Sequence, residues 1–533
     1  MVQFIKYNPG GDQVEKYILS VDCGTQSVRV AVFDENGNMP CYEKMEFEPY
    51  YSPKAGWAEV DPFLYWNKMC EGCEKISKSN PKIWSKLSGV VVTTLRDTNV
   101  CLDENGNPLR PVILWLDQRR AKCENKMNLK SRLAFLMIGM AQTVHYLRIN
   151  SKAYWLKENE PEIWKKTHKY VFISGFFNYL LTGKFIDSVA SQVGHMPFDY
   201  RKRKWLTPNQ LNWEIFGVDE EKLPEIKEPG EILGHVTAEA SRRTGIPEGI
   251  PVIAGGSDKG CETLGVGCLS PDTASISFGT TATIQSTTDK YMEAIRFLPA
   301  YPAVMPGHFN PEVQIYRGYW MISWFKNEFA DKENAEAKEK GVPVETILDK
   351  HLEDIPPGSD GLLIQPYWSP LIKNPYAKGA MIGFGDVHTR LHIYRAIIEG
   401  INFALIEGMH KIQKKTNVEI NRIMVSGGGA SSDHVCQITS DMFGKTVYKS
   451  ENSEACSLGA AMIGFVSLGI HSSYEKAVEK MVRIGKKFEP DRNNYKKYKS
   501  LYNRIYKRIY KKLKRIYMEI SHFNTLSSFI HKL

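Results

Sequence analysis

A short pattern of apolar and polar residues near the N-terminus constrains the fold of this chain more than any other feature. Residues 17–23 and 27–34 are rich in β-branched and aromatic side chains, and only a short polar loop beginning at Gly24 separates them. Two apolar runs joined by so short a glycine-containing loop predict a β-hairpin. The first part of the chain must therefore contain a sheet that begins with two antiparallel strands.

The tip of this hairpin is suited to holding phosphate. Backbone N–H groups at Gly24 and Thr25, the Thr25 and Ser27 hydroxyls and the Arg29 guanidinium are all donors for phosphoryl oxygens. Asp22, at the end of the first strand, is suited to orient Mg²⁺ through water. The alternative is an ordinary hairpin with a polar turn, because short loops that contain glycine are common.

Two later segments favour the phosphate-binding interpretation. Residues 274–284 again form an apolar run, a turn at Gly279-Thr280-Thr281 and a second run, which predicts another phosphate-binding hairpin. Residues 422–432 form a strand that passes through three glycines into a helix that begins near Asp433. Glycines at such a junction let the backbone approach a flat ring or a ribose closely. Together the segments predict a nucleotide bound by a protein of two α/β domains.

These motifs, in this order, resemble the FGGY family of carbohydrate kinases, which includes glycerol kinase, xylulokinase and ribulokinase. The similarity runs from about Tyr17 to about Pro490 and includes residues 57–62, 92–98, 113–119, 379–399 and 454–461. It implies an α/β protein with two ribonuclease-H-like ATPase domains, as in actin and hexokinase, and an interdomain cleft. We expect an N-terminal domain at residues 1–264, a C-terminal domain at 265–490 and a tail at 491–533.

The family transfers the γ-phosphoryl group of ATP, with Mg²⁺, to an alcohol. An alcohol is a poor nucleophile at neutral pH, so a carboxylate must accept its proton. Asp258 follows an apolar strand and Gly255-Gly256, and the resemblance implies that it is this base. We expect Asp258, with Asp22, to lie beside the metal as well. The alternative role for Asp258 is that of N-cap for a helix starting at Lys259, and the two roles are compatible.

The resemblance also implies a set of ATP-binding residues. They comprise the two phosphate loops, two residues that fall where the family contacts adenosine, and Ser323, which replaces a glutamine of glycerol kinase: Thr25, Gln26, Arg29, Gly279, Thr280, Thr281, Gly428, Ser432 and Ser323. Ser432 stands where glycerol kinase has an asparagine, so we expect it to make only part of that contact.

Five residues are candidates for binding the substrate: Arg96, Asp97 and Asp258, and in second rank Trp115 and Asp117. Arg96-Asp97-Thr98 resembles the Arg-Glu-Thr of glycerol kinase, and a guanidinium beside a carboxylate suits a diol, whose hydroxyls both donate and accept. The alternative is that Arg96 and Asp97 pair with each other at the end of a strand.

Departures from glycerol kinase bear on the substrate. Asp97 is one methylene shorter than the matching glutamate, and a tyrosine that lines the glycerol site has no clear counterpart near residues 147–150. Both changes leave more room, so we expect a polyol or a ketose larger than glycerol, such as the ketopentose xylulose. Lys259 replaces a glutamine, and a cation there would lower the pKa of the base or bind an acidic sugar.

The basic character of the chain belongs to its C-terminal tail. The whole chain carries a net charge of +9, whereas residues 491–533 contain twelve basic and two acidic side chains, so the remainder is close to neutral. Apolar residues recur every three or four positions over residues 495–520, which predicts a basic amphipathic helix. Three alternatives stay open for it: packing on the C-terminal domain, an oligomer contact, or contact with a lipid or polyanion surface.

The leading hypothesis is a cytoplasmic kinase of a small sugar or polyol that is dependent on ATP and Mg²⁺, forms a homodimer and does not bind nucleic acid. No run reaches the roughly 18 apolar residues that a membrane span needs, and the 10 cysteines are scattered in the manner of unpaired thiols. The alternative is a non-catalytic, regulatory nucleotide-binding protein of the same fold. Periodicity further predicts helices over residues 62–78, 174–181, 320–329 and 389–416.

Overall fold

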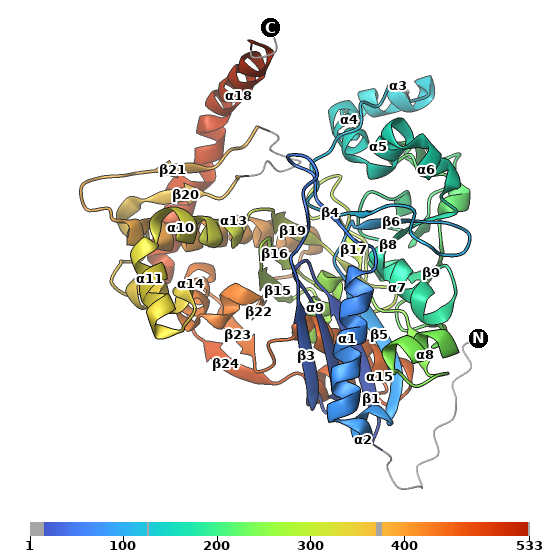
Figure 1. The fold of residues 1–533 in the computed structure, drawn as a ribbon. Helices are drawn as coiled ribbons and strands as arrows, with labels where there is room; N and C mark the ends of the chain where they lie inside the picture. The colour runs from blue at the N-terminus through green and yellow to red at the C-terminus, as the bar shows by residue number, and fades with distance from the viewer. Residues whose placement is uncertain (1–14, 125–126, 369–375, 531–533) are drawn as a thin grey trace. The chain divides into compact units, whose positions relative to one another are not determined.

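The computed structural model describes residues 15–124, 127–368 and 376–530, with side chains up to Phe523. The described chain forms two compact units. Unit 1 comprises the residues up to Gly267 together with Tyr301–Phe309 and Glu454–Val482, and unit 2 comprises Cys268–Ala300, Asn310–Ser453 and the chain from Arg483 onward. Each unit is built around a six-stranded sheet with helices packed on it (Figure 1).

The main sheet of unit 1 begins with the hairpin that the sequence predicts. Strand β1 pairs antiparallel with β2 and parallel with β5, so the hairpin continues into a mixed sheet. In spatial order the strands are β13 (Ile232–His235), β14 (Pro251–Ile253), β5 (Leu87–Thr94), β1 (Tyr17–Cys23), β2 (Ser27–Asp34) and β3 (Cys41–Glu46).

Helices pack on both faces of this sheet because successive residues of β1 point to opposite sides. Leu19 and Val21 belong to the hydrophobic core that contains Trp66 of helix α1 (Leu64–Ser79). Ile18 faces the other way and touches Gly464 of helix α15 (Ala455–Ser467). This arrangement explains why β1 is buried along its whole length.

Unit 1 also contains a smaller four-stranded sheet, in the order β4 (Glu59–Val60), β7 (Val112–Ile113), β6 (Asn99–Leu102) and β8 (Lys169–Phe172). Its short strands are β9 (Ile186–Ser188), β10 (Phe198–Asp199), β11 (Lys204–Trp205), β12 (Glu225–Lys227) and β17 (Tyr301–Pro302). Its other helices are α2 (Pro81–Trp84), α3 (Leu129–Met137), α4 (Ala141–Asn150), α5 (Lys152–Asn159), α6 (Pro161–Lys166), α7 (Ile173–Thr182), α8 (Ala238–Thr244), α9 (Asp258–Gly265) and α16 (Tyr474–Met481).

The sheet of unit 2 repeats the plan of unit 1. Its order is β19 (Glu312–Ile315), β16 (Ala282–Gln285), β15 (Thr273–Phe278), β22 (Arg422–Ser426), β23 (Thr446–Ser450) and β24 (Ile484–Phe488). The first hairpin strand, β15, pairs antiparallel with β16 and parallel with β22, as β1 does with β2 and β5. The two ribonuclease-H-like sheets expected from the sequence are therefore present.

Helices and one further hairpin complete unit 2. They are α10 (Trp320–Phe329), α11 (Asp331–Lys340), α12 (Val344–Leu348), α13 (Arg390–Thr416), α14 (Asp433–Phe443), α17 (Arg492–Leu501), α18 (Lys507–Ile530), and the strands β20 (Leu363–Gln365) and β21 (Ala380–Ile382). Strand β18 (Phe309–Asn310) spans the change of unit along the chain. The predicted helices over residues 62–78, 174–181, 320–329 and 389–416 correspond to α1, α7, α10 and α13.

Two segments differ from the expected domain boundaries, and the shorter one, Tyr301–Phe309, belongs to unit 1 although we expected it in the C-terminal domain. Residues 454–482, assigned from the sequence to the C-terminal domain, belong to unit 1. The reason is a close contact between helices: a Cβ on Gly459 of α15 would lie 1.9 Å from the carbonyl oxygen of Cys261, and a Cβ on Gly265 of α9 would lie 1.9 Å from that of Ala455. Only glycine lets the two backbones approach so closely.

The C-terminal tail is helical from Arg492 and packs within unit 2 as far as Tyr517. A π-helical turn at Tyr502–Tyr506 joins α17 to α18. The Tyr498 hydroxyl donates to Glu399 (2.7 Å) and accepts from Arg395 (2.9 Å). Tyr517 donates to Gln365 (2.9 Å). Up to this point the tail follows the first of the three alternatives, a helix packed on its own domain, and residues 531–533 lie outside the described residues.

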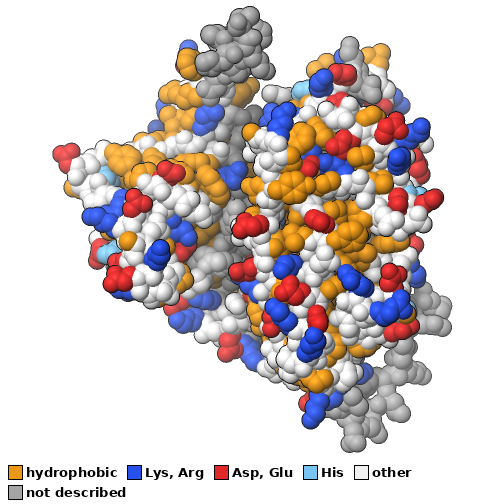
Figure 2. Space-filling model, viewed as in Figure 1, with side chains coloured by type: hydrophobic (Ala, Val, Ile, Leu, Met, Phe, Trp, Pro, Cys, Tyr) orange, Lys and Arg blue, Asp and Glu red, His pale blue; other side chains and the backbone are white. Residues whose placement is uncertain are grey.

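On the face drawn in Figure 2, basic and acidic side chains are interspersed. None of the helices that the structure describes is long and apolar enough to cross a membrane.

Candidate active site

Asp22 lies at the end of β1, where the hairpin pairing places it opposite Arg29 of β2. The Arg29 guanidinium contacts Asp22 (2.8 Å) and Glu454 (3.3 Å), and the Tyr42 hydroxyl donates to Glu454 (2.9 Å). Burial raises the pKa of Asp22 to about 6, although Arg29 opposes this effect, and the nearby Asp258 and Glu454 carboxylates raise it further. Asp22 is therefore a buried carboxylate that has an excess of negative charge around it.

The tip of the first hairpin differs in part from its predicted role. The Gly24 N–H donates to the Ser27 carbonyl (3.0 Å) and so is not the phosphate donor that the sequence predicts. Gln26 is exposed, and Thr25 is half-buried. The Trp115 indole N–H donates to the Thr25 hydroxyl (3.2 Å), which brings two predicted site residues 90 positions apart into contact.

Asp258 is the first residue of helix α9, and the backbone in front of it is closely packed. A Cβ on Gly255 would lie 2.4 Å from the Val92 carbonyl oxygen, so this position requires glycine. The N-cap of α9 is Ser257, whose hydroxyl accepts from the Gly260 N–H (3.3 Å). The alternative role of Asp258 as N-cap is therefore wrong, because the helix begins one residue earlier than expected.

The Asp258 carboxylate is partly accessible and has two neighbouring donors. Its Oδ1 accepts from the Lys259 N–H (2.7 Å), and the Nε of Arg96 lies 3.7 Å from the same oxygen. Arg96 Nε also donates to the Ser257 hydroxyl (3.3 Å), and its guanidinium lies over the Tyr301 ring at 5.1 Å. With 28% of its side chain exposed, Asp258 is open to a ligand.

Lys259 is tied to its own helix. Its ammonium lies 2.7 Å from the Glu262 carboxylate. Burial would lower the pKa of Lys259, but the Glu262 and Asp258 carboxylates outweigh it and raise that pKa above its usual value. Lys259 is therefore charged, and its charge is shared with Glu262.

Asp97 lies beside Arg96, but its carboxylate is directed to a histidine. Oδ1 accepts from the backbone N–H of His195 (2.9 Å), and Oδ2 lies 2.9 Å from His195 Nδ1. The Lys152 ammonium lies 3.3 Å from Oδ2 and donates to the Asp97 carbonyl. Burial would raise the pKa of Asp97, but His195 and Lys152 hold it well below its usual range. Among the described residues, the Asp97 carboxylate therefore pairs with His195 and Lys152, and the charge partner of Arg96 is Asp258. This differs from the alternative in which Arg96 and Asp97 pair with each other.

Asp117 is enclosed in a structural network. Its oxygens accept from the Arg119 guanidinium (2.8 Å each) and from the Ala58 N–H (2.6 Å), and 1% of its side chain is exposed. Arg119 in turn lies over the rings of Trp57 and Trp155. This geometry speaks against the predicted substrate contact of Asp117, because both oxygens of its carboxylate accept hydrogen bonds from the protein and almost none of its side chain is exposed.

In unit 2, the loop between β15 and β16 is held by the segment before α10. The Tyr319 N–H donates to the Gly279 carbonyl (3.1 Å), the Trp320 N–H donates to the Thr280 carbonyl (3.3 Å), and the Thr281 hydroxyl donates to the Tyr316 carbonyl (3.3 Å). Thr280 is exposed. The N–H side of the loop is therefore not used by these bonds, which suits a phosphate-binding turn.

The glycines after β22 differ in the space around them. A Cβ on Gly429 would lie 2.2 Å from the Tyr319 ring, whereas a Cβ on Gly428 would meet no atom within 4 Å in the part of the chain that the structure describes. Ser432 caps helix α14 by accepting from the Val435 N–H (3.3 Å). Ser323 is exposed on α10. Gly428 thus presents open backbone, and the Ser432 hydroxyl already serves the helix.

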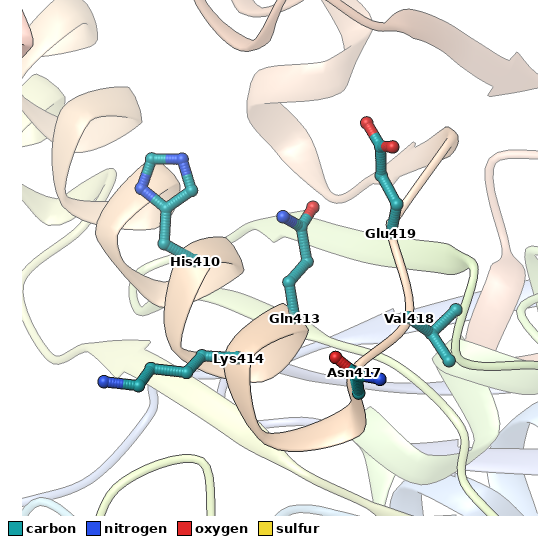
Figure 3. Close-up of a pocket in the computed structure, with 6 residues that line it drawn as sticks. All are labelled: His410, Gln413, Lys414, Asn417, Val418 and Glu419. Carbon is teal, nitrogen blue, oxygen red and sulfur yellow. The ribbon is translucent and has the colours of Figure 1, made fainter.

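A shallow hollow lies at the C-terminal end of α13 in unit 2. Figure 3 shows its lining residues, His410, Gln413, Lys414, Asn417, Val418 and Glu419. None of the predicted site residues lines it.

Sequence reasoning missed several residues that the structure brings to the candidate site. His195 carried no signal, because it is a single histidine in a segment without a recognised motif. Glu454 stood in a matched family segment, but its contact with Arg29 joins residues 425 positions apart. Tyr301 and Ser257 likewise were not singled out.

Comparison with known proteins identifies the family. The N-terminal-domain sequence model of the FGGY family of carbohydrate kinases matches residues 17–265, and the C-terminal-domain model matches residues 274–468. An uncharacterized sugar kinase of Escherichia coli (strain K12), YgcE, is 28% identical over 91% of this chain and 92% of its own length. A xylulose kinase of Bacillus subtilis (strain 168) is 28% identical over 96% of this chain and 99% of its own length.

Solved structures agree with the fold. The xylulose kinase of Rhodospirillum rubrum has a TM-score of 0.80 with 23% identity, covering 94% of this chain and 100% of that one. The gluconate kinase of Lactobacillus acidophilus has a TM-score of 0.79 with 21% identity, covering 95% and 100%. The protein belongs to the FGGY family of carbohydrate kinases and is a phosphotransferase with an alcohol group as acceptor.

Proposed function

We propose that this kinase transfers the γ-phosphoryl group of ATP to a hydroxyl of a polyol or ketose larger than glycerol, such as the ketopentose xylulose, with Asp258 as general base. One observation carries the proposal. Asp258 is a partly exposed carboxylate fixed at the start of a helix, with the Arg96 guanidinium 3.7 Å away. A base and a donor side by side suit a substrate hydroxyl that must be held and deprotonated.

In the proposed reaction the substrate hydroxyl loses its proton to the Asp258 carboxylate as its oxygen bonds to the γ-phosphorus. The bond from phosphorus to the β–γ bridging oxygen breaks, and ADP leaves with that electron pair. Arg96 orients the hydroxyl that reacts or its neighbour. The Lys259 N–H keeps the Asp258 carboxylate in place through its bond to Oδ1.

Asp22 and Asp258 fit the Mg²⁺ of a Mg·ATP complex. Magnesium bound through nucleotide phosphates commonly uses one or two carboxylates and keeps several waters. The two carboxylates lie close enough for Asp258 to raise the pKa of Asp22, together with burial, so a cation there would relieve their repulsion. When bound, the ion would neutralise charge on the phosphates.

For the nucleotide, the proposed phosphate contacts are Thr25, Gln26 and Arg29 in unit 1 and Gly279, Thr280 and Thr281 in unit 2. Gly428 is the proposed adenosine contact, supported by the open space beside its backbone. Ser432 and Ser323 remain weaker proposals, because the first caps α14 and the second is an exposed helix residue.

The test is ADP release from Mg·ATP with a panel of polyols, ketopentoses, ketohexoses and sugar acids, for wild type and Asp258→Asn. We expect one sugar to stimulate the wild type and the substitution to lower kcat by about 10²–10⁴-fold, because the general base is lost. ATP binding, followed by thermal shift, is expected to survive. Full turnover in Asp258→Asn would refute its role as base, and ATP binding without stimulation by any sugar would favour the regulatory alternative.

A further inference from the structure

We propose that His195 contacts the sugar and selects among sugars, and that Asp97 is a positioning residue that acts through His195. This inference rests on the proposed kinase function and deepens it. It departs from the expectation that Asp97 itself binds the substrate.

The contacts of Asp97 fix the imidazole of His195. The Asp97 carboxylate is held ionised by its surroundings, and an ionised carboxylate only accepts hydrogen bonds. The proton of the pair therefore lies on His195 Nδ1, 2.9 Å from Oδ2. The other nitrogen, Nε2, is then an acceptor in the neutral imidazole and a donor in the imidazolium, and a sugar hydroxyl, which both donates and accepts, suits either form.

Three constraints hold this pair in place. Asp97 has a φ of 47°, a left-handed conformation that is rare for a residue with a side chain. A Cβ on Gly194 would lie 2.5 Å from Asp97 Oδ1, so only glycine is tolerated before His195. Lys152 adds a buried ammonium against the same carboxylate. Strained and buried polar groups persist where surrounding structure over-determines them, and such places cluster at functional sites.

Of these three residues His195 has the most exposed side chain, and so it is the best placed to meet a ligand. Its side chain is 26% exposed, compared with 17% for Asp97 and 6% for Lys152. The Asp97 carboxylate is mostly buried, and both of its oxygens already have partners in the protein. It is therefore better suited to orient His195 than to bind a ligand itself.

A short chain of contacts joins the histidine to the proposed base. Asp97 follows Arg96, which lies close to Asp258. On the other side of His195, the Tyr200 hydroxyl lies 3.4 Å from both the N–H and the carbonyl of Gly194, and its ring packs on Tyr301 at 5.5 Å. Tyr301 in turn lies under Arg96. His195 is therefore connected to the reacting end of the site by a short chain of contacts, but is not part of it.

This placement predicts recognition of a hydroxyl remote from the one that is phosphorylated. A site built to hydrogen-bond a substrate hydroxyl rejects analogues that lack it, because the polar group of the protein is left unpaired. The substrate class is then an open-chain sugar with a hydroxyl several carbons from the reacting one, which glycerol does not offer.

The test uses D-xylulose and 1-deoxy-D-xylulose, which lacks the hydroxyl at one end. We expect wild type to prefer xylulose by at least tenfold in kcat/KM. His195→Ala is expected to raise the KM for xylulose at least tenfold, to abolish that preference, and to leave the KM for ATP unchanged. His195→Gln, whose amide reaches close to the position of Nε2, is expected to recover part of the preference. The exposed His168→Ala is the matched control.

A double-mutant cycle tests whether Asp97 acts by positioning His195 or binds the sugar itself. If Asp97 acts through His195, Asp97→Asn together with His195→Ala is no worse in kcat/KM than His195→Ala alone. Losses that multiply, or a preference that survives in His195→Ala, would overturn the proposal. Sugar binding followed as a thermal shift gives a second readout without phosphoryl transfer. If wild type turns over no sugar, that result counts against the kinase proposal. If xylulose raises the melting temperatures of wild type and His195→Ala equally, that result counts against this inference alone.

Discussion

Gly428 offers a test of the adenosine contact at the level of one methyl group. A Cβ there would meet no atom of the described residues within 4 Å, so Gly428→Ala is expected to fold with an unchanged melting temperature. If adenosine lies against this backbone, the added methyl occupies its space. The KM for ATP should then rise by about tenfold, since overpacking a contact typically costs 1–3 kcal/mol, while the KM for the sugar stays the same.

Gly429→Ala is the matched comparison. Its Cβ would lie 2.2 Å from the Tyr319 ring, so this variant should lose thermal stability. An unchanged KM for ATP in a normally folded Gly428→Ala would show that adenosine does not approach there.

For single residues, the sequence indicated which side chains and N–H groups could serve the site. It did not indicate which of their polar atoms are already hydrogen-bonded inside the protein. Asp258 follows a strand and two glycines, a local pattern, and in the structure it is the first residue of helix α9. Asp117 and the Gly24 N–H looked equally available, yet each is engaged inside the protein. Asp97 and His195 are 98 residues apart, so nothing in the local sequence of either indicates the other.

Strand β9 carries a buried carboxylate that makes the stability of its surroundings dependent on pH. Asp187 accepts from Ser174 (2.7 Å), Asn178 (3.1 Å) and Gln192 (2.8 Å), and so ties α7 to the segment that leads to His195. Burial raises the pKa of Asp187 to about 6, although these hydrogen bonds oppose the rise. The contacts explain how a charged residue is tolerated at this depth.

The direction of the pH effect follows from the raised pKa. The folded protein binds this proton more tightly than the unfolded chain, whose aspartates titrate near pH 4. The contribution to stability is therefore complete below about pH 4 and is lost as the pH rises through 6, by about 3 kcal/mol for a pKa difference of this size. Asp187→Asn removes the titration.

The measurement is the melting temperature of wild type and Asp187→Asn at pH 4.5 and pH 7. We expect the advantage of wild type over the variant to be larger at pH 4.5 than at pH 7. Taking the difference cancels other buried carboxylates such as Asp22, whose raised pKa acts in the same direction. Asp289→Asn, at an exposed position, is the control. A difference that grows with pH would mean that Asp187 is stabilised as the charged form.

Elements that depend on local patterns could be predicted from the sequence. The hairpin of β1 and β2 follows from two apolar runs and a short loop, and α13 follows from a long stretch with helical periodicity. The position of α15 did not follow, because it depends on a contact between Gly459 and Gly265, which are 194 residues apart. From its helix propensity alone, glycine is expected to destabilise a helix. Only the close packing of α15 on α9 explains why glycine occurs here.

For the whole molecule, the two similar hairpins implied only that the same kind of sheet occurs twice, since each hairpin fixes one antiparallel pair of strands. The parallel half comes from strands far away along the chain, and the sequence alone predicted no more than two α/β domains. Residues 454–482 belong to unit 1 although they follow most of unit 2 along the chain. They show why the domain boundaries were harder to predict than the fold class. A boundary is set by which surfaces pack, not by where along the chain a motif ends.

The tail gives the last prediction. Tyr498, Tyr506 and Ile509 are buried in the core of unit 2, and Tyr498 is bonded to both Arg395 and Glu399. Removing residues 491–533 would expose this core and leave two buried charged groups without the Tyr498 hydroxyl. Such losses typically cost several kcal/mol, so we expect a markedly lower melting temperature and loss of activity.

Removing only residues 519–533 should change little, because Tyr517 and the packed face of α18 remain, while the side chains of Ile520 and Phe523, which this deletion removes, are exposed. Tyr498→Phe isolates the hydroxyl and should fall between the two deletions, since it leaves the ring packed but removes one hydrogen-bond partner from both Glu399 and Arg395. Thermal melting of the three variants beside wild type decides the matter. If the long deletion melts like wild type, the tail does not stabilise unit 2, and an oligomer contact or a polyanion surface becomes the better explanation for its twelve basic residues.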